Sequence, residues 1–73
     1  MKKKMIIKIN KMACMHCAKT ITKALEEQDN ILKVKVDLKK KEALVIYKDN
    51  LDIDLIKNII NDLDYEFVEA IPY

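Results

Sequence analysis

The sequence contains no glycine, no tryptophan and no arginine, and it has one proline, one histidine and two cysteines among its 73 residues. Average usage of about 7% would give roughly five glycines, so backbone positions that need a positive φ must be filled by other residues. Two cysteines are too few for the disulfide framework of a small secreted domain. The absence of arginine, and of basic residues interleaved with aromatic ones, argues against binding to nucleic acid.

A targeting or membrane-spanning segment is also missing. The lysine-rich start resembles that of a signal peptide, but the apolar run at residues 5–7 ends at Lys8. A signal peptide needs about 7–15 apolar residues in a row, and a spanning helix needs about 20. We therefore expect a cytoplasmic protein that does not insert into a membrane.

The composition is that of one globular domain covering residues 1–73, with 51% hydrophobic and 36% charged residues. Its charges are unevenly distributed along the chain. Residues 1–41 carry 12 lysines against four acids, giving +8, and residues 42–73 carry two lysines against eight acids, giving −6. A solvated, salt-screened surface is one interpretation, and electrostatic docking with a charged partner protein is the other.

Hydrophobic periodicity predicts six elements. Alternation at Met5, Ile7 and Ile9 indicates a strand, and helical spacing follows over residues 15–28. Residues 31–38 and 42–48 alternate and form a hairpin across three lysines. A second helix is expected from residue 52 or 54 to residue 62, and a last strand at residues 65–71. The β-α-β-β-α-β order predicts an α+β, ferredoxin-like fold, with two helices on one face of a four-stranded antiparallel sheet.

Both cysteines lie within Met12-Ala13-Cys14-Met15-His16-Cys17, between the first strand and the first helix. Two thiols at this spacing can hold one soft metal ion or form a disulfide with each other. Soft sulfur ligands select ions such as Cu(I), whereas a structural zinc site uses four ligands. Cys17 in the first helical turn would be stabilised as a thiolate by the helix N-terminus, and Lys11 and Lys19 would add to this effect.

A Cys-x-x-Cys pair is also a redox motif, so a thiol-disulfide oxidoreductase is an alternative of a different class. The length and the predicted topology argue against it. The tryptophan and the proline that usually flank a redox motif are also missing, since Pro72 is the only proline.

The chain resembles the heavy-metal-associated domain family, whose first loop carries Met-x-Cys-x-x-Cys, matched here by Met12, Cys14 and Cys17. His16 before the second cysteine is similar to bacterial copper chaperones of the CopZ type. The family usually reads Gly-Tyr-Glu where this chain has Asp64, Tyr65 and Glu66, and it commonly has glycine where this chain has Lys11. Asp64 tolerates a positive φ better than most residues.

The resemblance implies a carrier and not an enzyme. Cys14 and Cys17 would bind Cu(I), with Hg(II), Ag(I) or Zn(II) as alternatives, and a partner's cysteine would take the ion over. The implied partner is the metal-binding domain of a copper-transporting P-type ATPase, or a copper-responsive regulator. Ala13 beside the first cysteine favours a monovalent ion, because family members selective for zinc or cadmium often have an acid there. Two further alternatives are that the chain is itself such an ATPase domain, or a mercury carrier.

The neighbouring residues have implied supporting roles. Met12 would pack beneath the loop as a hydrophobic anchor, and Tyr65 would lie close to the site and tune it. His16 would be exposed beside the metal, and the Met15 thioether is a candidate auxiliary ligand, particularly across a copper-bridged dimer that competes with the monomer. Lys19 and Lys23, together with Lys11, are predicted to steer docking onto an acidic partner.

Overall fold

The computed structural model describes residues 2–12 and 15–73, and all structural statements below refer to them. Four strands and two helices follow one another in the order β-α-β-β-α-β. Their bounds are β1 Lys2–Asn10, α1 Met15–Glu26, β2 Ile31–Asp37, β3 Glu42–Lys48, α2 Ile53–Asp62 and β4 Glu66–Pro72. The ferredoxin-like prediction is confirmed.

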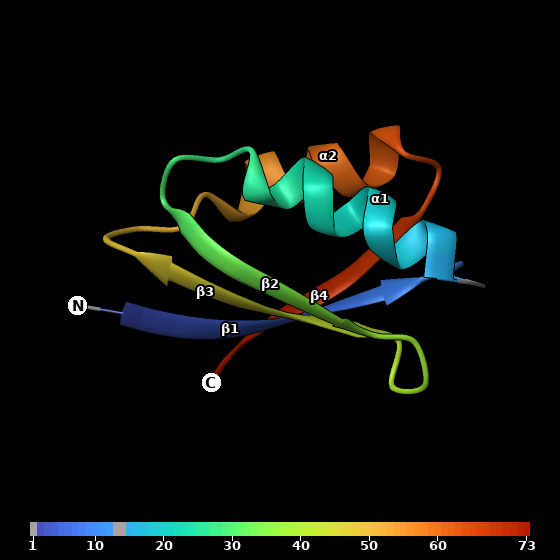
Figure 1. The fold of residues 1–73 in the computed structure, drawn as a ribbon, viewed down its shortest axis with the longest axis horizontal. Coiled ribbons are helices and arrows are strands. Elements are labelled where there is room, and N and C mark those ends of the chain that lie inside the picture. The colour runs from blue at the N-terminus through green and yellow to red at the C-terminus, as the bar shows by residue number, and fades with distance from the viewer. Residues whose placement is uncertain (1, 13–14) are drawn as a thin grey trace.

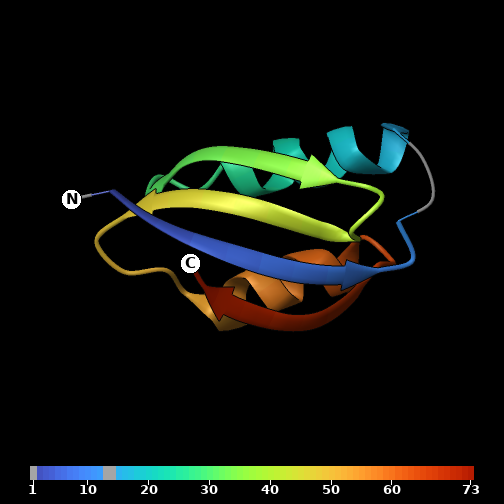
Figure 2. The same ribbon diagram turned by 90° about the horizontal axis from the view of Figure 1, so that it is seen from below.

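All strand pairs are antiparallel, and the sheet order is β2-β3-β1-β4. Both helices lie on the same face of the sheet, and the opposite face is open (Figures 1 and 2). The end of β1 and the start of α1 lie at the end of the molecule opposite to the start of β1 (Figure 1). Met12, which follows β1, and Cys17 in the first turn of α1 therefore lie toward one tip of a molecule that extends 33 Å along its longest axis.

Branched aliphatic side chains fill the layer between helices and sheet. Ile7 and Ile9 of β1 are fully buried, as are Ile21 of α1 and Ile60 of α2. In β3 and in the second half of β1 the buried residues alternate with more exposed ones, because successive side chains point to opposite faces. The core therefore holds β1 and α1 in place on either side of the cysteine loop.

The helix α2 begins at a capped end. The Asp52 carboxylate accepts a hydrogen bond of 3.1 Å from the Leu55 backbone N–H, which satisfies one of the donors that a helix start leaves unpaired. At the β2–β3 hairpin, Asp37 accepts from the backbone N–H groups of Lys39 and Lys40. The predicted lysine turn is confirmed.

The sequence interpretation was wrong at one position in β2. Alternation assigned Leu32 to the same face as Val34, but Leu32 is 45% exposed and the preceding Ile31 is buried. The register of β2 against β3 shifts between Ile31 and Lys33, so one extra residue is accommodated and the alternation changes phase. In α1 the buried residues Ala18, Ile21 and Leu25 follow at helical spacing, as the periodicity predicts.

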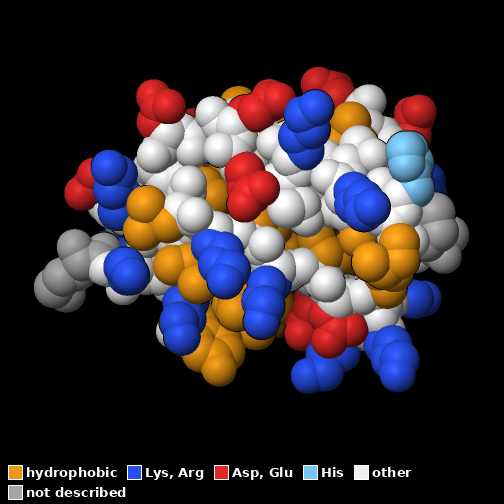
Figure 3. Space-filling model, viewed as in Figure 1, with side chains coloured by type: hydrophobic (Ala, Val, Ile, Leu, Met, Phe, Trp, Pro, Cys, Tyr) orange, Lys and Arg blue, Asp and Glu red, His pale blue; other side chains and the backbone are white. Residues whose placement is uncertain are grey.

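The charge asymmetry along the chain becomes an asymmetry of the surface. Figure 3 shows most acidic side chains of this view along the top, over the helices, and a group of lysines interspersed with hydrophobic side chains lower down, over the sheet. Acidic residues are also present near the metal-loop end of the sheet, where Lys8 Nζ pairs with Glu42 at 2.6 Å.

Candidate metal centre

The cysteine motif joins the end of β1 to the start of α1. Cys17 is the third residue of α1 and is half-buried, with its side chain packed against the hydrophobic core. Backbone N–H groups at a helix start are unpaired within the helix and favour a negatively charged sulfur. Cys14, the other predicted ligand, and its neighbour Ala13 lie outside the described residues.

The loop is entered through an unusual backbone conformation at Lys11. Its φ is 72°, in the left-handed region, although its side chain carries a Cβ atom. The next residue, Met12, is only 7% exposed and belongs to the core cluster. Met12 thus fixes the proximal end of the loop by burial, while the Lys11 ammonium stays exposed.

Tyr65 reaches the same tip from the other end of the chain. Asp64 has φ of 68°, so the chain turns sharply after α2, and the Tyr65 N–H donates to the Ile60 carbonyl at 3.2 Å. The next residue, Glu66, pairs with Asn10 in the sheet. Tyr65 therefore lies next to the end of β1, where the chain enters the cysteine loop. Its half-buried side chain packs against the core.

One hydrogen bond at this tip was not predicted from the sequence. The Asn10 side-chain amide donates a hydrogen bond of 2.9 Å to the Glu66 carboxylate. It holds the last residue of β1 against the first residue of β4, next to the loop. A polar pair 56 positions apart in the sequence gives no signal until the strand register is known.

Met15 and His16, which stand between the two cysteines in the sequence, both face solvent. Met15 is 65% exposed, and His16 is exposed as well. The hydrogen bond of His16 within the helix is made by its backbone, whose carbonyl accepts from the Thr20 hydroxyl at 2.9 Å. Neither residue contributes to the core, so both are accessible to a docking partner.

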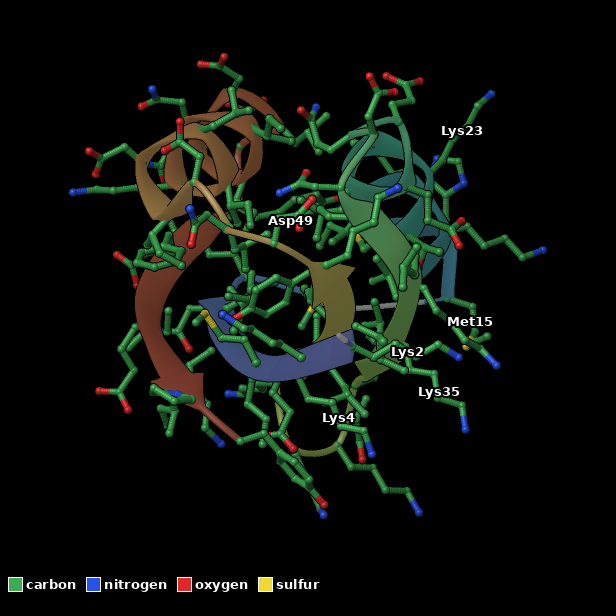
Figure 4. The ribbon with its side chains drawn as sticks, turned by 90° about the vertical axis from the view of Figure 1, so that its left-hand side faces the viewer. Lys2, Lys4, Met15, Lys23, Lys35 and Asp49 are labelled. Carbon is green, nitrogen blue, oxygen red and sulfur yellow. The ribbon has the colours of Figure 1, made fainter. Side chains whose placement is uncertain are left out.

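A groove between α1 and β2 begins beside Met15. Met15, Lys19 and Lys23 follow one another at four-residue spacing on α1 and line this groove, which has a volume of about 410 Å³. A second open hollow of about 590 Å³ continues along β2 and shares Met15 and Lys35 with the first. Figure 4 shows Met15 between Lys23 of α1 and Lys35 of β2 along this edge of the molecule. The structure thus brings two of the predicted docking lysines together with Met15.

Potential metal donors other than the cysteines do not gather anywhere in residues 2–12 and 15–73. No group of three or more His, Cys, Asp or Glu side chains there is arranged to hold an ion. Within the same residues, no helix has the length and apolarity needed to cross a membrane.

Comparisons with known proteins agree with the fold and the motif. No curated protein sequence matches the chain. Among solved structures, a CopZ metallochaperone superposes with a TM-score of 0.83 at 27% identity, covering 89% of this chain and 98% of that one. A copper transporter domain of yeast, CCC2A, solved in apo and Cu(I)-loaded states, gives 0.82 at 25% identity, covering 97% and 94%.

A copper-binding domain of the P-type ATPase HMA7 is similar at a TM-score of 0.79 and 25% identity, covering 97% of this chain and 93% of that one. The family model of the heavy-metal-associated domain matches residues 6–66, which include every residue of the predicted centre. The chain belongs to the heavy-metal-associated domain family.

Proposed function

We propose that the chain is a Cu(I) carrier that binds the ion through Cys14 and Cys17 and passes it to a partner by thiolate exchange. The observation that carries the proposal is the position of Met12-x-Cys14-x-x-Cys17 between β1 and the N-terminus of α1, in a domain of the heavy-metal-associated family. The proposed role is that of a carrier and not of an enzyme. Similarity to a CopZ metallochaperone and to two copper-binding transporter domains supports copper as the cargo.

A two-thiolate site suits this task chemically. Soft thiolates select Cu(I) over harder ions, and two of them leave room at the ion for a further sulfur ligand. An incoming cysteine thiolate of a partner can then form a new S–Cu bond, giving a three-coordinate intermediate. One S–Cu bond to this chain breaks afterwards, and copper stays Cu(I) throughout. Hg(II), Ag(I) and Zn(II) are competing ions for the same thiols.

The neighbouring side chains support the loop in different ways. Burial of Met12 favours an anchoring role over ligation, since its thioether is removed from solvent with the core. Tyr65 lies at the same tip and would limit access to the metal from the β4 side. His16 and Met15 are exposed, so they would act on contact with a partner or in a copper-bridged dimer.

The proposed partner is a metal-binding domain of a copper-transporting P-type ATPase, with a copper-responsive regulator as the second choice. Lys19 and Lys23 line the groove that begins at Met15, so an acidic partner docked there would reach the metal loop. Lys11, exposed beside the loop, would add to the attraction.

The alternative that the chain is itself a domain of such an ATPase is favoured by its similarity to the HMA7 and CCC2A domains. One domain spanning residues 1–73, and a cytoplasmic location, stay predictions.

The proposal is tested by titrating the reduced protein with Cu(I) against a competing chelator of known affinity. One equivalent of Cu(I) should be held against the chelator by the wild-type chain. Cys14→Ser and Cys17→Ser should each abolish this retention, whereas His16→Ala should retain the stoichiometry. Retention of copper by both cysteine variants would overturn the assignment of the site. Insulin reduction by the metal-free protein would instead favour an oxidoreductase.

A further inference from the structure

The open face of the sheet carries a charge pattern that the metal site does not use. The fully buried side chains of β1 and β3, such as Ile7, Ile9 and Val45, form one core cluster with side chains of α1 and α2 and therefore lie on the helix side of the sheet. Side chains at the alternate positions therefore lie on the open face. Figure 2 shows this face toward the viewer, with the four strands side by side and the helices behind them.

The strand register arranges these alternate positions in rows across the sheet. One row contains Lys33, Ile46 and Lys4, and Tyr73 joins it because its N–H donates to the Lys4 carbonyl at 3.2 Å. The neighbouring row contains Lys35, Leu44, Ile6 and Ile71. Lys2 and Lys48 pair with each other beyond the first row.

These ten side chains form what we call the basic sheet face. Its charged members are Lys2, Lys4, Lys33, Lys35 and Lys48, and all five are exposed. Its apolar and aromatic members are Ile6, Leu44, Ile46, Ile71 and Tyr73. It contains five lysines and no acid. The Asp49 carboxylate, which follows Lys48 in sequence, lies on the helix side of the sheet, whereas Lys4 and Lys35 lie on the other side (Figure 4).

The exposed apolar groups are concentrated at one edge of this face. Tyr73 is 75% exposed and Ile71 is 37% exposed. The Lys4 ammonium lies 5.4 Å from the centre of the Tyr73 ring, within the range of a cation–π contact. The next row of the same open face holds Asp37, Glu42 and Glu69 around Lys8 and lies on the side toward the metal-loop end. Lys35 and Leu44 border this row and share a hollow with Met15.

We propose that the basic sheet face docks on the anionic lipid surface of a membrane. Clusters of about four to eight lysines bind anionic headgroups, each lysine near the surface contributing a factor of about five in affinity. Partly exposed isoleucine and tyrosine side chains add contact with the interfacial layer, and the long lysine stems can cover apolar surface while their ammonium groups meet phosphates. Five lysines among five apolar or aromatic side chains match this chemistry, and the acids of the open face lie in the row next to them, toward the metal-loop end.

Other occupants fit the face less well. Single-stranded nucleic acid is held by stacking on several aromatic rings, and Tyr73 is the only aromatic residue of the face. A second copy related by a two-fold axis through the face would bring lysines against lysines. Docking on lipid also leaves the metal tip accessible, because the acidic row beside it is repelled by an anionic surface and the tip lies at the far end of the long axis (Figure 1).

The test is sedimentation of the full chain with sucrose-loaded vesicles made of equal parts phosphatidylglycerol and phosphatidylcholine, or of phosphatidylcholine alone. We expect binding to the mixed vesicles at low salt, no binding to the neutral ones, and weakening as the ionic strength rises. A triple variant of Lys4, Lys33 and Lys35 to glutamine should lose roughly a hundredfold in partition coefficient. The matched control changes Lys19, Lys23 and Lys57 to glutamine, removes the same charge from the helices and should lose only a few-fold.

Equal losses in the two triple variants would overturn the proposal, as would no binding of wild type to the mixed vesicles. Retention of single-stranded oligonucleotide, or a concentration-dependent dimer, in place of vesicle binding would assign the face to another occupant. A Tyr73→Trp variant tests the orientation independently of the lysines, since the chain has no other tryptophan. Its emission should shift to the blue with mixed vesicles, and an unchanged spectrum in a sedimenting sample would contradict docking through this face.

Discussion

The side-chain amide of Asn10 lies 2.9 Å from the carboxylate of Glu66 and donates a hydrogen bond to it. This contact joins the strand that leads into the cysteine loop to the strand that begins after Tyr65. It is the side-chain link between the two segments that frame the metal tip.

Removal of this link should loosen the tip without disturbing the core. We expect Asn10→Ala and Glu66→Ala each to lower the free energy of unfolding by about 0.5–1.5 kcal/mol, the net value of a typical hydrogen bond. The double variant should cost less than the sum of the two, because the same contact is lost in each. Urea unfolding of the four proteins measures this coupling, and simple additivity would show that the contact contributes nothing.

Lys11 should respond to substitution by glycine in the opposite direction. A left-handed conformation costs a residue with a Cβ atom about 1–2 kcal/mol, and glycine removes this cost while adding some freedom to the unfolded chain. Lys11→Gly is therefore expected to raise the free energy of unfolding by about 0.5–1 kcal/mol.

Two controls isolate this backbone effect. Lys11→Ala removes the charge but retains the Cβ atom, so it should not stabilise the protein. Lys40→Gly places glycine at an exposed turn residue without a positive φ and should be neutral or destabilising. Stabilisation by Lys11→Ala as large as that by Lys11→Gly would assign the effect to the charge instead.

Met12 offers a way to separate packing from metal ligation. It is 7% exposed within the core cluster, so Met12→Ala should cost about 2–5 kcal/mol of stability. Met12→Leu conserves the volume and should cost less than about 1.5 kcal/mol, with Cu(I) retention unchanged. Loss of Cu(I) retention in a folded Met12→Leu protein would make the thioether a ligand.

The start of α2 provides a prediction away from the site. Asp52→Ala removes the acceptor for the Leu55 N–H and should destabilise the protein by about 1 kcal/mol. Asp54→Ala changes the same charge within the first turn without removing the cap and should cost less. Thermal unfolding compares the stability of the two variants. An equal loss of stability in both would show that Asp52 acts through its charge and not through its hydrogen bond to the Leu55 N–H.

The order of elements could be predicted from the sequence because the apolar residues of β1, β3 and the two helices recur at the same spacing as their buried residues. Where a residue departs from this spacing, the pairing between neighbouring strands is the cause. The register shift after Ile31 moved Leu32 to solvent, and no residue type marks that shift. Positive φ at Asp64 was expected from its side chain. At Lys11 the residue type gives no such signal, and only the glycine that is common in the family at this position points to a positive φ.

The candidate centre was predicted by spacing, and Met12 and Tyr65 beside it by the family resemblance, whereas the groove and the sheet face were not predicted. Met12, Cys14 and Cys17 follow one another in a motif, so their proximity needs no knowledge of the fold. The groove that joins Met15 to Lys35 depends on β2 being the edge strand next to α1. The basic sheet face likewise depends on strand register, because its lysines come from three different strands.

The central claim is that copper leaves this chain by direct exchange with a partner's cysteines. The most direct measurement is the rate of Cu(I) transfer from the loaded chain to a copper-free heavy-metal-associated domain of a copper ATPase, with a metal chelator present to trap released ion. The account predicts a rate that rises in proportion to the acceptor concentration and exceeds the rate of release to the chelator alone. A transfer rate independent of the acceptor, and equal to the rate of release, would contradict it.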